Sequence, residues 1–127
     1  MNMTMLLAIG AGGAIGSICR FLVVGAIGGA TGSTWPWGTL LVNVVGGLAI
    51  GALAEAMALR WEASPELRGF LVTGILGGFT TFSAFSLETM AMLERQEWTQ
   101  ALSYAGASVA LSLLAAFAGA WGVRLAS

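Results

Sequence analysis

The sequence predicts an all-α integral membrane protein with four transmembrane helices. Of its 127 residues, 57% are hydrophobic and only 9% are charged, and the mean hydropathy is +0.88. Soluble globular proteins carry far more charge than this. The charged residues are separated by apolar stretches long enough to cross a hydrocarbon core of about 30 Å, which takes about 20 residues as a helix. We therefore expect residues 1–127 to form a single four-helix transmembrane domain.

The limits of the spans follow from the positions of charges and turn signals. The uncharged stretch between Arg20 and Glu55 is too long for one helix, and a glycine-rich and threonine-rich segment at residues 28–34, followed by Pro36, divides it. The first span therefore continues across Arg20. All five tryptophans then fall at membrane interfaces, where indole rings prefer to lie. The expected spans are residues 5–28, 37–59, 67–92 and 98–122.

Glycines recur at four-residue spacing in the first two spans, as the pair Gly12 and Gly16 and the pair Gly47 and Gly51. Small residues at this spacing let helices approach closely in lipid, where ordinary hydrophobic attraction between helices is absent. We therefore expect these glycines to mark helix contacts.

The third span contains a segment, residues 77–81, that is unfavourable inside a helix. Two adjacent glycines and a phenylalanine precede two β-branched threonines, so we expect the third helix to be broken near residues 77–81. A break at membrane depth frees main-chain carbonyls, which must then face protein, water or a cation. The alternative is a close glycine contact without unwinding.

Polar side chains form two tracks inside the expected spans. In the second span, Thr39 lies one turn before Asn43, a carboxamide in the middle of the span. In the fourth span, Tyr104, Ser108 and Ser112 are spaced by four residues and share one face. Hydrogen bonding between or within helices is the simpler interpretation. A narrow path of neutral donors, with no basic side chain to trap the ion, is also what rapid permeation of a small anion requires.

Two phenylalanines follow the expected break. Phe82 and Phe85 are three residues apart and share a helix face. The edges of their rings are positively polarised and can contact an anion. Packing against neighbouring helices is the alternative.

The inventory of reactive residues argues against an enzyme. The chain has no His, Asp or Lys and a single cysteine, Cys19. Catalytic triads, Cys-His pairs and His-based or multi-cysteine metal sites are therefore excluded. A net charge of −1 without a basic cluster also excludes nucleic acid as a partner.

The arginines carry only a weak orientation signal. With four spans, both termini and the loop between the second and third spans lie on one side of the membrane. That side carries Arg60, Arg68 and Arg124, and the other carries Arg95 and, if its side chain reaches the interface, Arg20. So small a bias permits insertion in both orientations, and it equally permits an ordinary protein with cytoplasmic termini.

Taken together, these residues resemble the Fluc/CrcB family of bacterial fluoride ion channels. The matching stretches are residues 13–21 (GAIGSICRF), 38–46 (GTLLVNVVG) and 77–85 (GGFTTFSAF). Length and number of spans are similar too, so the resemblance covers nearly the whole chain. It implies a fluoride-selective passive channel that exports fluoride across the bacterial inner membrane and reduces fluoride toxicity.

The resemblance also implies an assembly and a set of functional residues. The assembly is an antiparallel, dual-topology homodimer in the lipid bilayer, with two fluoride pathways. A structural sodium ion at the dimer interface is held by the main-chain carbonyls of Gly77 and Thr80, and Arg20 lies near a vestibule. The implied pore-lining residues and the polar track beside them are Asn43, Phe82, Phe85, Thr39, Glu88, Tyr104, Ser108 and Ser112.

The main competing function is a small dual-topology, proton-coupled exporter. Such a transporter needs a titrating carboxylate near the centre of the bilayer. Glu55 and Glu88 both lie toward span ends, where contact with interfacial water is the simplest interpretation, and Asn43 occupies the middle. A purely structural membrane subunit is the third possibility, and it would leave both polar tracks as redundant interhelical bonds.

Overall fold

Four helical spans make up the protein in a computed structural model, which describes residues 2–127. All four are long and apolar enough to cross a membrane, so the expected number of spans is confirmed. Three are continuous helices: α1 (Met3–Thr31), α2 (Trp37–Leu59) and α6 (Trp98–Leu125). The third span, Pro65–Glu94, consists of α3 (Pro65–Arg68), the π-helix η1 (Gly69–Leu76), α4 (Gly77–Phe79) and α5 (Phe82–Glu94).

Local signals explain where the first span begins and ends. The Asn2 side chain caps α1 by accepting a hydrogen bond from the Met5 amide at 2.7 Å. At the other end Gly32 adopts φ 59°, a left-handed conformation that glycine reaches at little cost. Each observed span lies within three residues of its expected limits, and α2 coincides with them.

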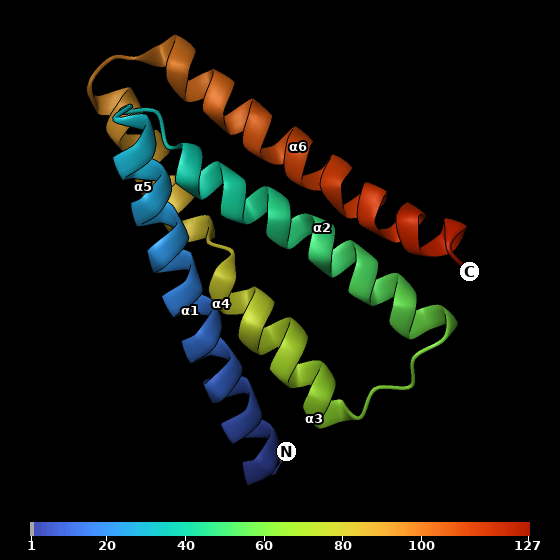
Figure 1. The fold of residues 1–127 in the computed structure, drawn as a ribbon. Helices are drawn as coiled ribbons and strands as arrows, with labels where there is room; N and C mark the ends of the chain where they lie inside the picture. Colours follow the sequence, from blue (N-terminus) through green and yellow to red (C-terminus); the bar gives the residue numbers. More distant parts are fainter. Residues whose placement is uncertain (1) are drawn as a thin grey trace.

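Both termini lie at the same end of the bundle as the connection between α2 and α3 (Figure 1). Arg60, in that connection, donates a hydrogen bond to the Ala126 carbonyl at 3.1 Å. At the N-terminus, the Asn2 amide reaches Glu66 of α3 at 3.5 Å. The arrangement agrees with the even number of spans that the sequence predicts.

Helix α2 packs side by side with α6 (Figure 1), and glycines make this possible. A β-carbon on Gly47 would lie 2.7 Å from the Ser112 carbonyl oxygen, and one on Gly51 would overlap the carbonyl of Ala116. Gly119 of α6 is confined in the same way by Leu48. The expectation that Gly47 and Gly51 mark a helix contact is therefore confirmed.

Helix α1 pairs with the third span in the same manner. A β-carbon on Gly12 would lie 2.9 Å from the Ile75 amide nitrogen, and one on Gly16 would lie 2.9 Å from the Phe79 amide nitrogen. The protein thus consists of two closely packed helix pairs, and the space between them remains for the site described below.

The third span leaves helical geometry at Thr80 and Thr81, which we call the extended pair. Thr80 has φ −85° and ψ 159°, and Thr81 has φ −151° and ψ 118°. Gly77 and Gly78 are helical, although the sequence places them in the break. Gly78 has a packing role instead, since its β-carbon would lie 2.6 Å from the Gly13 carbonyl oxygen. The β-branched threonines are the residues that favour an extended backbone.

The first half of the third span has a feature that the sequence did not predict. Residues Gly69–Leu76 form a π-helix, a geometry that is rare and tends to occur near functional sites. It ends at Leu76, and the three residues of α4 separate it from the extended pair.

Candidate functional site

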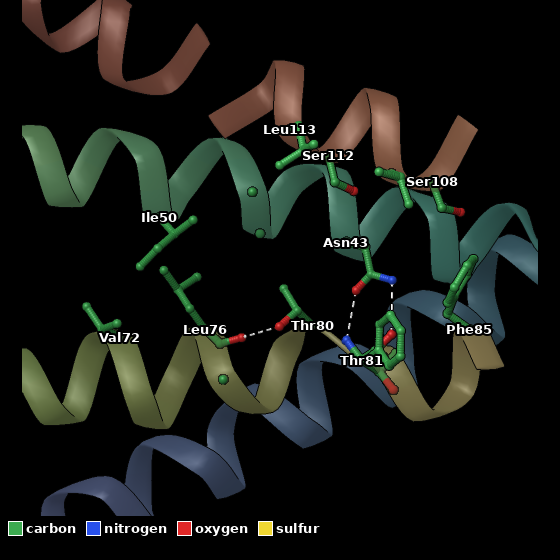
Figure 2. Close-up of a pocket in the computed structure, with 15 residues that line it drawn as sticks. Asn43, Ile50, Val72, Leu76, Thr80, Thr81, Phe85, Ser108, Ser112 and Leu113 are labelled. Carbon is green, nitrogen blue, oxygen red and sulfur yellow. Dashed lines mark hydrogen bonds between the residues drawn. The ribbon is translucent and has the colours of Figure 1, made fainter. Parts of the chain in front are cut away.

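An open groove of about 550 Å³ lies between α2, the third span and α6 (Figure 2). Its lining is mostly apolar, as expected of a surface within the membrane. Most of the residues that the sequence singles out are among those that line it: Asn43, Gly77, Thr80, Phe82, Phe85, Ser108 and Ser112.

Asn43 joins α2 to the extended pair through both ends of its carboxamide. The Thr81 amide donates to Asn43 Oδ1 at 2.8 Å, and Asn43 Nδ2 donates to the Thr81 carbonyl at 3.0 Å. Figure 2 shows both bonds side by side on the wall of the groove. Asn43 therefore lines the groove, and the main chain of Thr81 engages its oxygen and one of its N–H groups.

The two phenylalanines lie one after the other along α5. Their ring centroids are 5.4 Å apart with the planes inclined at 47°. Phe85 also contacts Tyr104 of α6, with centroids 5.2 Å apart. Phe82 is 76% exposed on the single chain, so its ring is not explained by packing within that chain.

The hydroxyl track of α6 differs in hydrogen bonding along its length. Tyr104 is fully buried and Ser108 is 6% exposed, while Ser112 is half-buried. The Ser108 hydroxyl has no hydrogen-bond partner among residues 2–127. A buried hydroxyl without a partner costs about 1–3 kcal/mol, and this one is on the groove wall, where a ligand can satisfy it.

Glu88 connects the two polar tracks. Its carboxylate accepts hydrogen bonds from the Thr39 hydroxyl at 2.9 Å and from the Tyr104 hydroxyl at 3.1 Å. Glu88 therefore has two hydroxyl partners within the protein, which its position toward a span end did not indicate. Thr39 and Glu88 line a second cavity of about 250 Å³ at the end of the bundle where α2 begins, so Glu88 lies between the track and that cavity.

Arg20 lies outside both cavities. Its Nε donates to the Gly78 carbonyl at 2.9 Å, and neither ion pair formed by residues 2–127 involves it. The helical donor for that carbonyl would be the Phe82 amide, which the extended pair moves away. Arg20 thus donates to the Gly78 carbonyl in place of the main-chain amide that a continuous helix would supply.

Two other carbonyls beside the interruption receive no hydrogen bond. No donor among residues 2–127 reaches the carbonyl of Gly77 or that of Thr80, whereas the Thr80 amide and hydroxyl both bond to the Leu76 carbonyl at 3.0 Å. Both residues line the open groove. Uncharged main-chain oxygens of this kind are suitable ligands for a hard monovalent cation. The described residues contain no group of three or more acidic, histidine or cysteine residues that could hold a metal.

Two contributors escaped the sequence analysis. Thr81 caps α5, its hydroxyl accepting from the Ala84 amide at 3.0 Å, and the threonine three residues before Ala84 was a readable N-cap signal. Trp35 packs edge-on against Tyr104 with centroids 5.2 Å apart. Its position before the second span predicts only an interfacial residue, so this contact could not be anticipated.

Comparison with known proteins places the chain in a family. Residues 7–120 match the family described as CrcB-like protein, Camphor Resistance (CrcB). The chain belongs to the CrcB family. It is therefore a multi-pass membrane protein of a family that is not enzymatic, in agreement with its four spans.

Three relatives in the CrcB family show how far the similarity extends. One from Rhizobium meliloti is 53% identical over 117 residues, covering 92% of this chain and 94% of the relative. One from Caulobacter sp. is 52% identical over 118 residues, covering 92% of each. One from Nitrobacter winogradskyi is 48% identical over 125 residues, covering 98% of this chain and 99% of the relative. Each of the three is named as a fluoride-specific ion channel, FluC.

The hydrogen bonds of Glu88 make a prediction about stability in this CrcB protein. Glu88→Ala leaves the Thr39 and Tyr104 hydroxyls, 2% and 0% exposed as residues, without their acceptor. Each such loss should cost about 1–3 kcal/mol of the free energy of unfolding. Glu88→Gln retains one acceptor oxygen and should be clearly less destabilising. Thermal unfolding of the purified proteins in detergent measures both, and equal midpoints for the two variants would show that these bonds do not support the fold.

Proposed function

We propose that this protein is a fluoride-selective passive ion channel that exports fluoride across the bacterial inner membrane and so reduces fluoride toxicity. The observation that carries the proposal is the buried Ser108 hydroxyl, which lacks a partner and lies on the wall of a groove at membrane depth. Relatives named as fluoride-specific ion channels, about half identical over nearly the whole chain, support the same conclusion.

Neutral donors are well suited to a small, strongly hydrated anion. Fluoride leaves water only where donors replace its hydration shell. On the groove wall, the Ser108 hydroxyl has no partner among residues 2–127, and Asn43 has one N–H that Thr81 does not use. The groove contains no basic side chain that would hold the anion permanently. A narrow constriction lined with closely spaced donors also disfavours larger halides, so size and donor density together give selectivity.

Phe82 and Phe85 extend the pathway beside these donors. Both residues line the groove, and the edges of their rings carry the positive end of the quadrupole, which can contact an anion. Together with Asn43 and Ser112, they supply a continuous set of weak anion contacts. At the far end, Thr39, Tyr104 and Glu88 lead toward the second cavity.

A proton-coupled exporter is less well supported. Within residues 2–127, the one carboxylate that bonds to the hydroxyl track belongs to Glu88, and its two oxygens accept hydrogen bonds from Thr39 and Tyr104. Glu88 lies near the end of the third span, with Thr39 in the first turn of α2. The polar side chain that α2 contributes to the groove lining is that of Asn43, which does not titrate.

The functional form in this proposal is an antiparallel, dual-topology homodimer, with the interrupted third helices meeting at its centre. The groove is open and largely apolar along one side of the single chain, and Phe82 is 76% exposed beside it. A second copy would close the groove into a pathway. The nearly balanced distribution of arginines between the two sides supports insertion in both orientations.

A structural sodium ion completes the proposed dimer. The carbonyls of Gly77 and Thr80, which receive no hydrogen bonds from residues 2–127, would hold it. Two such carbonyls from each copy supply uncharged oxygen ligands, which favour sodium over magnesium because they do not easily compensate the dehydration of a divalent ion. The ion would neutralise carbonyl dipoles where the two chains meet.

The first test is transport by the purified protein in liposomes. Fluoride release should be fast and should follow the imposed electrochemical gradient, because the groove lining includes no titrating residue among residues 2–127. Chloride should stay inside, because it is larger than fluoride. A fluoride electrode and a chloride electrode measure the two fluxes on the same preparation. Uphill fluoride movement that requires a proton gradient would replace the channel by a transporter.

A matched variant for this test is Phe82→Ile, which roughly keeps side-chain volume and removes the aromatic edge. Fluoride release should be abolished or sharply reduced while the yield of folded dimer stays normal. Unchanged flux would remove Phe82 from the pathway.

Dual topology makes a prediction about labelling. In a Cys19→Ala background, Ser127→Cys should react with an impermeant thiol reagent from both faces of intact membranes, in roughly equal amounts, because the arginine bias is weak. Removing Cys19 is necessary because it is exposed. Labelling from one face only would leave an ordinary fixed topology.

The sodium ion makes a prediction about assembly. Sodium should raise the thermal stability of the dimer, by about 2.7 kcal/mol at one hundred times its dissociation constant, and the same concentration of N-methylglucamine should not. Gly77→Val should remove this sodium effect and weaken the dimer. Within one chain a β-carbon there meets only the Val72 carbonyl oxygen, at 3.6 Å, so the single chain should still fold. Equal stability in the two salts would refute the ion.

A further inference from the structure

The extended pair creates a problem that the chain must solve inside the membrane. A continuous helix satisfies all of its main-chain groups internally, and lipid offers no substitute partners. At Thr80 and Thr81 that ladder is interrupted, because both residues have extended dihedral angles. The Thr81 amide and carbonyl are therefore left to find partners outside the third span.

Asn43 supplies both partners from α2. Its Oδ1 accepts from the Thr81 amide at 2.8 Å and its Nδ2 donates to the Thr81 carbonyl at 3.0 Å. The side chain thus pairs with the main chain of one residue as a neighbouring strand would pair with it. Figure 2 shows the carboxamide directed at Thr81.

The residues on either side of Thr81 are held as a consequence. The Thr81 hydroxyl starts α5 by accepting from the Ala84 amide at 3.0 Å, and this places Phe82 in the first turn of that helix. On the preceding side, the Thr80 amide closes α4 on the Leu76 carbonyl at 3.0 Å. Between these two points, the Thr80 carbonyl is the one main-chain group of the extended pair that no hydrogen-bond partner among residues 2–127 reaches.

Arg20 anchors the same segment from α1. Its Nε bonds to the Gly78 carbonyl at 2.9 Å, so the interruption is held from two helices. Asn43 retains one N–H that none of these bonds uses. That single donor is little for an anion, whereas the two bonds to Thr81 satisfy two main-chain groups at once.

The geometry points to Asn43 as a positioning residue, whose carboxamide holds the Thr81 main chain and thereby sets the direction of the Thr80 carbonyl and the place of Phe82. The role of these two groups in ion conduction rests on the function proposed above. We call the two hydrogen bonds between Asn43 and the Thr81 main chain the clasp. The clasp does not depend on the proposed function, since it concerns only the hydrogen bonds of Thr81.

Hydrogen exchange at the Thr81 amide tests the clasp directly. The measurement uses isotope-labelled full-length protein in detergent micelles, followed by NMR, without fluoride. Asn43→Ala removes the acceptor and should speed exchange at Thr81 by about tenfold or more, since an amide loses its only bond. Asn43→Asp keeps an acceptor oxygen in the same place and should leave this amide protected, while losing the donor to the Thr81 carbonyl.

Thr89→Ala is the matched control. It removes a side-chain hydrogen bond to the Phe85 carbonyl, 2.8 Å long, in the same span, and should leave exchange at Thr81 unchanged. Protection of amides in α6 reports whether each variant is folded, and Asn43→Ser serves in place of Asn43→Ala if the latter does not fold. Slow exchange at Thr81 in the folded Ala or Ser variant would overturn the proposal, as would fast exchange in both the Ala and the Asp variants.

Transport then separates the clasp from the channel function. If Asn43 acts through the extended pair, both Asn43→Ala and Asn43→Asp should lose fluoride flux in liposomes, although only the first exposes the Thr81 amide. Suppose that Asn43→Ala speeds exchange at Thr81 but the wild-type protein conducts no fluoride. The clasp would then be supported and the proposed channel function would be rejected. Normal flux with an exposed Thr81 amide would show that Asn43 does not position the conducting groups.

Discussion

The need to satisfy every main-chain polar group within the membrane governs this structure. Three of the four spans meet it as unbroken helices. The third does not, because Thr80 and Thr81 are extended. Asn43 and Arg20 therefore turn toward this point from α2 and α1 and restore the missing bonds. The carbonyls that they leave unsatisfied, of Gly77 and Thr80, are the ones that border the groove.

Glycine allows the helices to come close enough for such short side chains to reach. Gly46 faces Thr80 so closely that a β-carbon would overlap the threonine methyl group. Asn43, one turn earlier on α2, can therefore bond to Thr81 without water between them. Between the two pairs an open groove remains, lined by residues of α2, the third span and α6. The close contacts within the helix pairs and the open groove between them both follow from where the glycines lie.

The polar residues of the site serve two different ends. Thr39, Tyr104 and Glu88 satisfy one another and add a fixed polar cluster where α2 begins. Ser108, one turn along α6, has no such partner. In a medium without water that difference matters energetically, because an unmade bond is retained only where something else can make it. Along α6, the hydroxyl of Tyr104 is therefore satisfied by Glu88, and the hydroxyl of Ser108 is the one left for a partner from outside the described residues.

The sequence by itself determined the number of spans, their limits to within a few residues and most of the groove, because hydropathy, helix period and glycine spacing are local properties. It also pointed to the segment of the interruption, but it placed the helical Gly77 and Gly78 in the break together with the threonines. Only the tertiary structure decided that Gly78 is a contact with α1, that Glu88 binds two hydroxyls and that Asn43 is engaged by Thr81. These facts depend on residues about 16 to 65 positions apart meeting in space, and no local pattern specifies which donor will find which acceptor when lipid supplies none.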